Sequence, residues 1–156
     1  MKAKRCCFAG HSRISEKESV MKRLREVATE LIEKENVTEF WVGNRGDFDL
    51  SSASVIRELK ELYPHIKLEL VIPYLTQEII TNKVRYNGRY DSIFLADIPE
   101  TTPRRFRILK ANQYMADNSS FLICYINYTF GGAVKTAEYA KRKKHIKVIN
   151  LGELEL

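Results

Sequence analysis

The chain has no apolar run that approaches the ~20 residues a membrane-spanning helix requires. Its first residues, Met1 to Arg5, are followed by a strand-like segment and not by the pattern of a cleaved signal peptide. We therefore expect a cytoplasmic protein with no membrane partner. The chain also contains no internal repeat and no low-complexity segment, and its 156 residues suffice for a single domain over 1–156 with one well-buried core.

Cysteine is scarce, with three residues in the chain. Three cysteines do not make a disulfide framework, and no cluster of cysteine and histidine has metal-ligand spacing. Cys6 and Cys7 are adjacent, so a regular strand would point them to opposite faces, and they could not hold one metal together. We expect buried, apolar cysteines, no metal site and no cofactor.

The chain has too few acidic residues to balance its 26 lysines and arginines, and its net charge is +6 at pH 7. This charge suits an anionic ligand, but it is spread along the sequence. The densest cluster, Lys141 to Lys144, ends an expected helix, where the macrodipole favours cations. Because we see no exposed aromatic residues interleaved with the charges, a nucleic-acid partner is unlikely on this pattern.

Apolar periodicity predicts helices that alternate with short apolar strands. The order favours βαβ units, and so a three-layer, Rossmann-like α/β fold with a mostly parallel sheet. Ser15 is the expected N-cap of the first helix, and Asn87-Gly88 should break an ambiguous segment over 75–90. We expect helices at 17–35, 49–63, 104–118 and 132–144, and strands at 6–9, 39–42, 67–72, 91–95, 121–126 and 145–151.

Three apolar segments, at 6–9, 39–42 and 121–126, lead into loops that contain glycine. In a parallel sheet such strand exits lie along one edge, where a crevice takes the ligand, and a helix that opens there presents unpaired N–H groups to a phosphate. The pattern predicts a nucleotide-type ligand, although each glycine could also serve only a tight turn. The candidate ligand contacts among the glycines are Gly10, Gly43, Gly46, Gly131 and Gly132.

Polar residues beside these glycines extend the candidate site. His11 follows the first strand and could bind a ribose or phosphate, or could brace the loop. Arg13 and Arg45 are commonly surface charges, but Arg45 stands with Asn44 inside a glycine loop, where a guanidinium fits a phosphate.

Four further residues are candidates for the same site. Asp49 is expected to cap a helix, a contribution of about 1 kcal/mol, whereas Asp47 could bond a ribose hydroxyl. Tyr74 follows a proline at a strand end and could stack on a base, or could belong to the rim. The Thr136 hydroxyl could add one phosphate contact.

Several segments, taken in order, resemble the SLOG superfamily of small bacterial proteins, whose relatives include Smf/DprA, the Lonely Guy phosphoribohydrolases and the YpsA-like proteins. The segments are Cys7 to His11, Phe40 to Asp49, Tyr63 to Ile66, Ala111 to Met115 and Gly131 to Ala133. The resemblance spans nearly the whole chain. It implies a Rossmann-like domain that holds a nucleotide or nucleotide-derived molecule at the strand ends, and it does not imply one reaction.

The departures from the family pattern bear on activity. Lonely Guy enzymes carry Gly-Gly-x-Gly-Thr-x-x-Glu, and Glu138 falls at the register of that catalytic glutamate, but Val134-Lys135 replaces the second glycine and threonine. Ala111 stands where the wider group has an arginine beside Asn112. We therefore favour a sensor or binding module over the alternative of an N-glycosidase acting on nucleoside monophosphates. Nucleic-acid binding is a second alternative, and the resemblance also allows a homo-oligomer.

Overall fold

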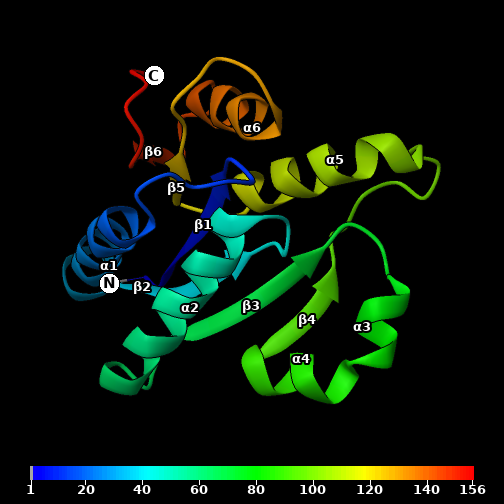
Figure 1. Cartoon of the computed structure of the whole chain (residues 1–156), viewed down its shortest axis with the longest axis horizontal. Coiled ribbons are helices and arrows are strands. Elements are labelled where there is room, and N and C mark those ends of the chain that lie inside the picture. Colours follow the sequence, from blue (N-terminus) through cyan, green and yellow to red (C-terminus); the bar gives the residue numbers. More distant parts are fainter. Residues whose placement is uncertain (1) are drawn as a thin grey trace.

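A computed structural model describes residues 2–156 of the chain. Six strands form one sheet in the order β4-β3-β2-β1-β5-β6, and all five neighbouring pairs are parallel (Figure 1). The predicted Rossmann-like α/β fold is confirmed. The strands are β1 Lys4–Gly10, β2 Val37–Val42, β3 Lys67–Ile72, β4 Ser92–Leu95, β5 Phe121–Tyr125 and β6 Lys147–Asn150.

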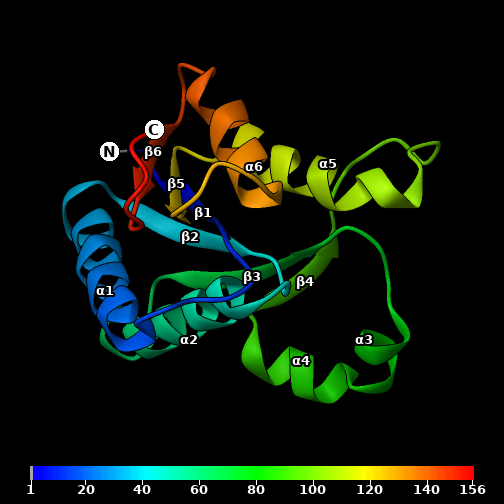
Figure 2. The same cartoon turned by 45° about the horizontal axis from the view of Figure 1, so that its top comes forward.

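Helices cover both faces of the sheet, and they lie in two layers on either side of it (Figure 2). One core packs beneath α1 to α4, and a second core packs beneath α5 and α6. None of the helices within residues 2–156 is long and apolar enough for a membrane crossing. The helices are α1 Lys17–Lys34, α2 Asp47–Leu62, α3 Gln77–Thr81, α4 Lys83–Arg89, α5 Arg104–Asp117 and α6 Gly132–Lys141.

Strand β1 lies in the middle of the sheet and is buried on both faces. Its side chains alternate, so that Cys6 and Phe8 join the core under α1 and α2, whereas Cys7 and Ala9 join the core under α5 and α6. Cys6 and Cys7 thus point away from each other, as the strand period requires. Their burial raises the pKa of the Cys6 thiol well above its ordinary value and that of Cys7 to about 12.

Two local expectations were wrong. Ser15 is not the N-cap of α1, because Glu16 holds that position in a left-handed conformation without a side-chain cap, and the Ser15 hydroxyl instead lies 3.1 Å from the Tyr125 hydroxyl. Asn87-Gly88 does not break the chain but lies inside α4. The short helix is held by its tyrosines, since the rings of Tyr86 and Tyr90 stack at 6.3 Å and contact the core.

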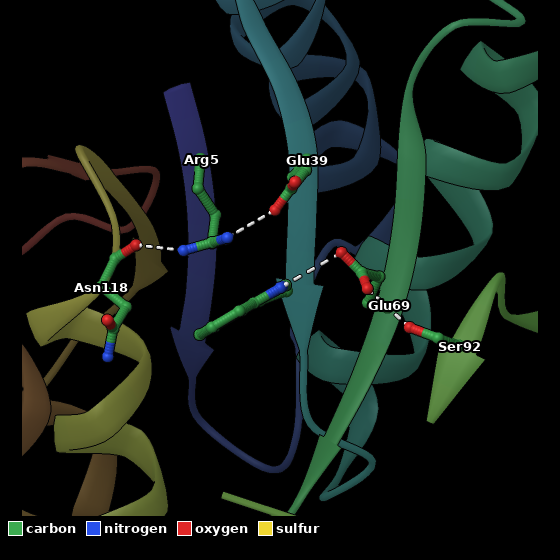
Figure 3. Close-up of polar contacts among 6 residues, drawn as sticks. Arg5, Glu39, Glu69, Ser92 and Asn118 are labelled. Atoms are coloured by element: carbon green, nitrogen blue, oxygen red, sulfur yellow. Dashed lines mark hydrogen bonds and ion pairs between the residues drawn. The ribbon is translucent and has the colours of Figure 1, made fainter. Parts of the chain in front are cut away.

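A row of polar side chains ties four strands together on the face covered by α5 and α6 (Figure 3). Arg5 on β1 forms an ion pair of 2.6 Å with Glu39 on β2. The indole N–H of Trp41, also on β2, donates to Glu69 on β3, and Glu69 accepts a second bond from the Ser92 hydroxyl on β4. These contacts add side-chain links between strands that already pair through their backbones.

Candidate functional site

The candidate site lies at the carboxyl edge of the sheet, where the strand order reverses. From β1 the chain proceeds outward through β2, β3 and β4, and it returns to the other side of β1 with β5. Such a switch point leaves a crevice beyond the strand ends, because the loops that follow β1 and β5 diverge. A cleft of about 260 Å³ occupies this place, and its walls come from the exits of β1, β2 and β3, from α5 and from the start of α6.

The glycine exits converge on this cleft, with one exception. Gly10, Gly43, Gly131 and Gly132 all line it. Gly46 does not, because it serves a close contact between two loops: its φ is +89°, and a Cβ added there would lie 2.6 Å from the Cα of Ser12. The structure therefore gives Gly46 a clear role in backbone packing.

The start of α6 faces open space. Gly131 is the N-cap residue of this helix with φ of +104°, and a Cβ added to Gly131 or Gly132 would meet nothing within 4 Å. The Lys135 amide donates to the Gly131 carbonyl as the helix begins. The preceding amides of a helix have no partner in the previous turn, so they are available to an anion in the cleft.

His11 lines the cleft and also braces it. Its Nε2 accepts a hydrogen bond of 3.0 Å from the backbone N–H of Asn127, and its own backbone N–H donates to the Tyr125 carbonyl. Burial lowers the pKa of the imidazole. A neutral ring that accepts at Nε2 carries its proton on Nδ1. The position of His11 is thus compatible with both expected roles, contact with a ligand and bracing of the loop.

Three aromatic rings form a continuous stack that begins at His11. The Tyr128 ring lies 3.6 Å from the imidazole at an interplanar angle of 5°, and the Phe130 ring lies 4.4 Å from the Tyr128 ring. Tyr128 lines the cleft, whereas Phe130 is 70% exposed. Neither ring is among the site residues predicted from the sequence.

Asp49, and not Asp47, reaches the cleft. The helix begins at Asp47, so Asp49 does not cap it as expected; its carboxylate accepts a hydrogen bond of 2.9 Å from the Arg45 amide. Burial raises the pKa of the Asp49 carboxyl to about 7, and the Arg45 bond and charge oppose this effect. Asp47 instead accepts a bond of 3.4 Å from the Ile14 amide.

Arg45 and Tyr74 lie together beside the cleft. Arg45 is exposed, lines the cleft with Asn44, and donates from its guanidinium to the Tyr74 hydroxyl. Tyr74 lies in an adjoining hollow and not in the cleft itself. Arg13, also exposed, is outside the residues that line either cavity.

The residues that correspond to the motif of the Lonely Guy enzymes do not lie together. Glu138 is exposed and lies outside the cleft, and the Thr136 hydroxyl is buried and donates to the Gly132 carbonyl within α6. Ala111 and Asn112 do line the cleft. The position of the missing arginine is therefore a wall of the cleft, and here that wall is apolar.

Metal ligands do not gather anywhere in the part of the chain that the structure describes: residues 2–156 contain no group of three or more His, Cys, Asp or Glu side chains placed to hold an ion. Cys124 is buried, and burial raises the pKa of its thiol to about 12. A thiol with such a pKa is inert as a nucleophile at neutral pH. The chemistry of the cleft therefore depends on its backbone amides, Asp49, His11 and Arg45.

The fold and the cleft define the class of protein: a Rossmann-like domain with a cleft at its switch point. No protein-family model matches the chain. It is similar to the UPF0398 protein of Halalkalibacterium halodurans, with 25% identity over 147 residues that cover 87% of this chain and 77% of that protein.

Two solved structures share the fold. DNA processing protein A of Helicobacter pylori, which binds single-stranded DNA, matches with a TM-score of 0.63 and 14% identity over 94% of this chain. DprA of Streptococcus pneumoniae matches with a TM-score of 0.63 and 15% identity over the same share. The chain spans 64% and 50% of these two proteins. These two likenesses show the Rossmann-like fold that the resemblance of the motifs implied.

Proposed function

We propose that this protein binds a nucleotide or a nucleotide-derived molecule in the switch-point cleft and acts as a sensor or binding module. The observation that carries the proposal is the open start of α6, where Gly131 and Gly132 border the cleft with empty space above them. A phosphate can approach these backbone amides closely because no side chain intervenes, and the helix macrodipole favours its charge.

The other walls suit the remainder of a nucleotide. Tyr128 supplies a ring edge, since His11 and Phe130 cover its two faces, and Asp49 supplies a carboxyl at the exit of β2. An acidic group at that exit commonly accepts a hydrogen bond from a ribose hydroxyl in Rossmann-like domains. We therefore assign the ribose contact to Asp49 in place of Asp47, while the His11 Nδ1–H is a candidate donor to the ligand.

A pair of glycine substitutions tests this proposal. Gly132→Val adds a side chain over the amides, and Gly88→Val is its matched control, because Gly88 also has open space but lies in α4. A ligand at 100 times its Kd stabilises a folded protein by about 2.7 kcal/mol. Nucleotides should raise the Tm of wild type and of the Gly88 variant, and should leave that of Gly132→Val unchanged.

Circular dichroism must show that Gly132→Val is folded. If this folded variant is stabilised as strongly as wild type, the phosphate does not lie at α6. Native mass spectrometry of protein purified without added nucleotide would identify a ligand that copurifies.

Binding of single-stranded DNA is a second candidate, and one observation favours it. The sequence pattern makes a nucleic-acid partner unlikely because it predicts no exposed aromatics among the charges. The structure corrects that reason, since Phe106, Tyr128 and Phe130 are 46%, 41% and 70% exposed, and the Arg105 guanidinium lies 4.8 Å from the Phe106 ring. Exposed rings beside cations are the elements on which single strands stack. The structural neighbour from H. pylori binds such strands.

A further inference from the structure

An arrangement of two arginines around one tyrosine stands beside the cleft. The Arg104 guanidinium, at the start of α5, lies 4.0 Å from the centre of the Tyr74 ring, and that of Arg45 lies 5.3 Å from the same centre. Arg45 also donates to the Tyr74 hydroxyl. Three separate elements, the exits of β2 and β3 and the first turn of α5, thus bring two cations to one ring.

These two cations are not neutralised by the protein. Within residues 2–156, no carboxylate forms an ion pair with either guanidinium. The first turn of α5 holds no acidic residue, so the charge of Arg104 opposes the helix macrodipole. Two like charges held around one ring, one of them at the positive end of a helix, are stabilised when an anion lies between them.

Arg45 stands where two cavities meet, and Arg104 is exposed beside it over the Tyr74 ring. The cleft adjoins a hollow of about 140 Å³, and both are lined by Asn44, Arg45 and Pro73. Glu78 also lines the hollow, and its carboxylate accepts a hydrogen bond from Tyr86. Because this carboxylate disfavours an anion inside the hollow, the favoured position for an anion is the junction beside Arg45.

The spacing of the sheet separates this junction from the start of α6. Strand β5 precedes α6, and β1 lies between β5 and β2, so the strand ends from which the two places begin are two strand spacings apart, or about 10 Å. The two phosphates of a diphosphate share a bridging oxygen, so they lie closer together than two phosphates with a nucleoside between them. A ligand of the second kind therefore spans more of this separation.

We infer that Arg45 and Arg104 form a second phosphate site, so that the cleft takes a ligand whose two phosphates flank one nucleoside. A nucleoside 3′,5′-bisphosphate has this chemistry, and so does one step of a polynucleotide. The inference rests on the proposed function, because it requires a first phosphate at α6. It makes the distance between phosphates the determinant of specificity.

Calorimetric titration tests it, with a diphosphate and a bisphosphate that match in the number of phosphates. The probes are a nucleoside monophosphate, the diphosphate and the 3′,5′-bisphosphate, each in the adenosine, guanosine, cytidine and uridine series. For the preferred base, the bisphosphate should bind at least ten-fold more tightly than the diphosphate, although both carry two phosphates. Equal affinities for these two ligands would overturn the second site.

Substitutions then locate the second phosphate. Arg45→Gln and Arg104→Gln should each weaken bisphosphate binding at least ten-fold and monophosphate binding far less. Lys110→Gln is the control, since Lys110 is exposed on the same helix and lines neither cavity, and it should change no affinity by more than two-fold. Losses of the same size for the monophosphate and the bisphosphate would show that the arginines hold no separate phosphate.

The same measurements separate this inference from the proposed function. If no nucleotide binds, both fail; if the monophosphate binds and the bisphosphate has no advantage, only the second site fails. A 20-residue thymidine oligonucleotide distinguishes the two sources of the chemistry. Tighter binding of the oligonucleotide, lost in Arg45→Gln and Arg104→Gln, would support a polynucleotide ligand, and tighter binding of the bisphosphate would support a small molecule.

Discussion

The imidazole of His11 and the backbone of Asn127 are joined by a hydrogen bond of 3.0 Å, with Nε2 as the acceptor. This bond connects the exit of β1 with the loop that leads from β5 to the open start of α6. The side chain of Asn127 extends the connection, because it donates to the Tyr125 hydroxyl and accepts from the Glu153 amide. The shape of the cleft therefore depends on a neutral His11.

The His11 bond should make stability depend on pH. Its pKa is lowered in the folded state, so as the pH falls below about 6.5 the unfolded chain takes up a proton first. The stabilisation is complete above pH 6.5 and is lost as the pH falls through the folded pKa, because a protonated Nε2 cannot accept from Asn127. His11→Ala should cost about 1–3 kcal/mol at pH 7.5 for the unpaired amide alone.

Urea unfolding at pH 7.5 and pH 5 measures this effect. The difference in the free energy of unfolding between wild type and His11→Ala should shrink at the lower pH. A difference that is the same at both values would show that the imidazole does not titrate with folding.

The Asp49 carboxyl should act in the opposite direction. Its pKa is raised from 3.8 to about 7, so between these values the folded state holds a proton that the unfolded chain has released. The contribution to stability is complete below about pH 4 and is lost as the pH rises through 7. Each pKa unit corresponds to about 1.4 kcal/mol, which gives an upper limit of about 4 kcal/mol for the whole shift.

Asp49→Asn removes this titration and keeps an oxygen for the Arg45 amide. The variant should gain stability relative to wild type between pH 5 and pH 8, and chemical denaturation at both pH values measures the gain. Asp47→Asn is the matched control, since Asp47 lies two residues away and bonds the Ile14 amide. If both variants show the same pH profile, the buried carboxyl is not the cause.

Much of the fold could be predicted because its signals are periodic and local. The apolar stripe over 17–35 and the apolar run at 67–72 correspond closely to α1 and β3. The segment over 75–90 could not be predicted in the same way. Its glycine indicates a break, but the rings of Tyr86 and Tyr90 pack against a core assembled from distant strands, and that tertiary contact has no local signature.

The candidate site shows the same limit. The glycines that line the cleft were identified from strand exits, since chain direction in a parallel sheet dictates where exits lie. Asp49 was expected to cap the helix but lines the cleft, whereas Asp47 bonds the Ile14 amide. A shift of two residues at the start of a helix turns a side chain from one loop to another. Tyr128 was missed because nothing in a loop sequence shows which way a ring turns.

Hydrolysis of nucleoside monophosphates should be absent. A phosphoribohydrolase requires a carboxylate at the ribose and a cation at the phosphate, but Glu138 lies outside the cleft and Ala111 replaces the arginine. Incubation of wild type with nucleoside monophosphates should release no free base above the rate in buffer, as measured by chromatography. Release of base by wild type and its loss in Glu138→Gln would favour an N-glycosidase over a binding module.

Binding of single-stranded DNA, if it occurs, should depend on the ring stack and not on the densest cationic cluster. Lys141, Arg142, Lys143 and Lys144 lie at the end of α6, which rises about 1.5 Å per residue, so they stand roughly 15 Å or more from its glycine start. We expect Phe130→Ala to weaken a single-strand complex by 1–3 kcal/mol, the usual cost of losing one stacked base. Replacement of all four cations by glutamine should leave nucleotide binding in the cleft unchanged.

Fluorescence anisotropy over a series of salt concentrations checks both variants, since a complex held by phosphate contacts alone weakens steeply with salt. A tight complex that resists salt, survives Phe130→Ala and is lost in the quadruple variant would place the nucleic-acid interface at the far end of α6, away from the cleft.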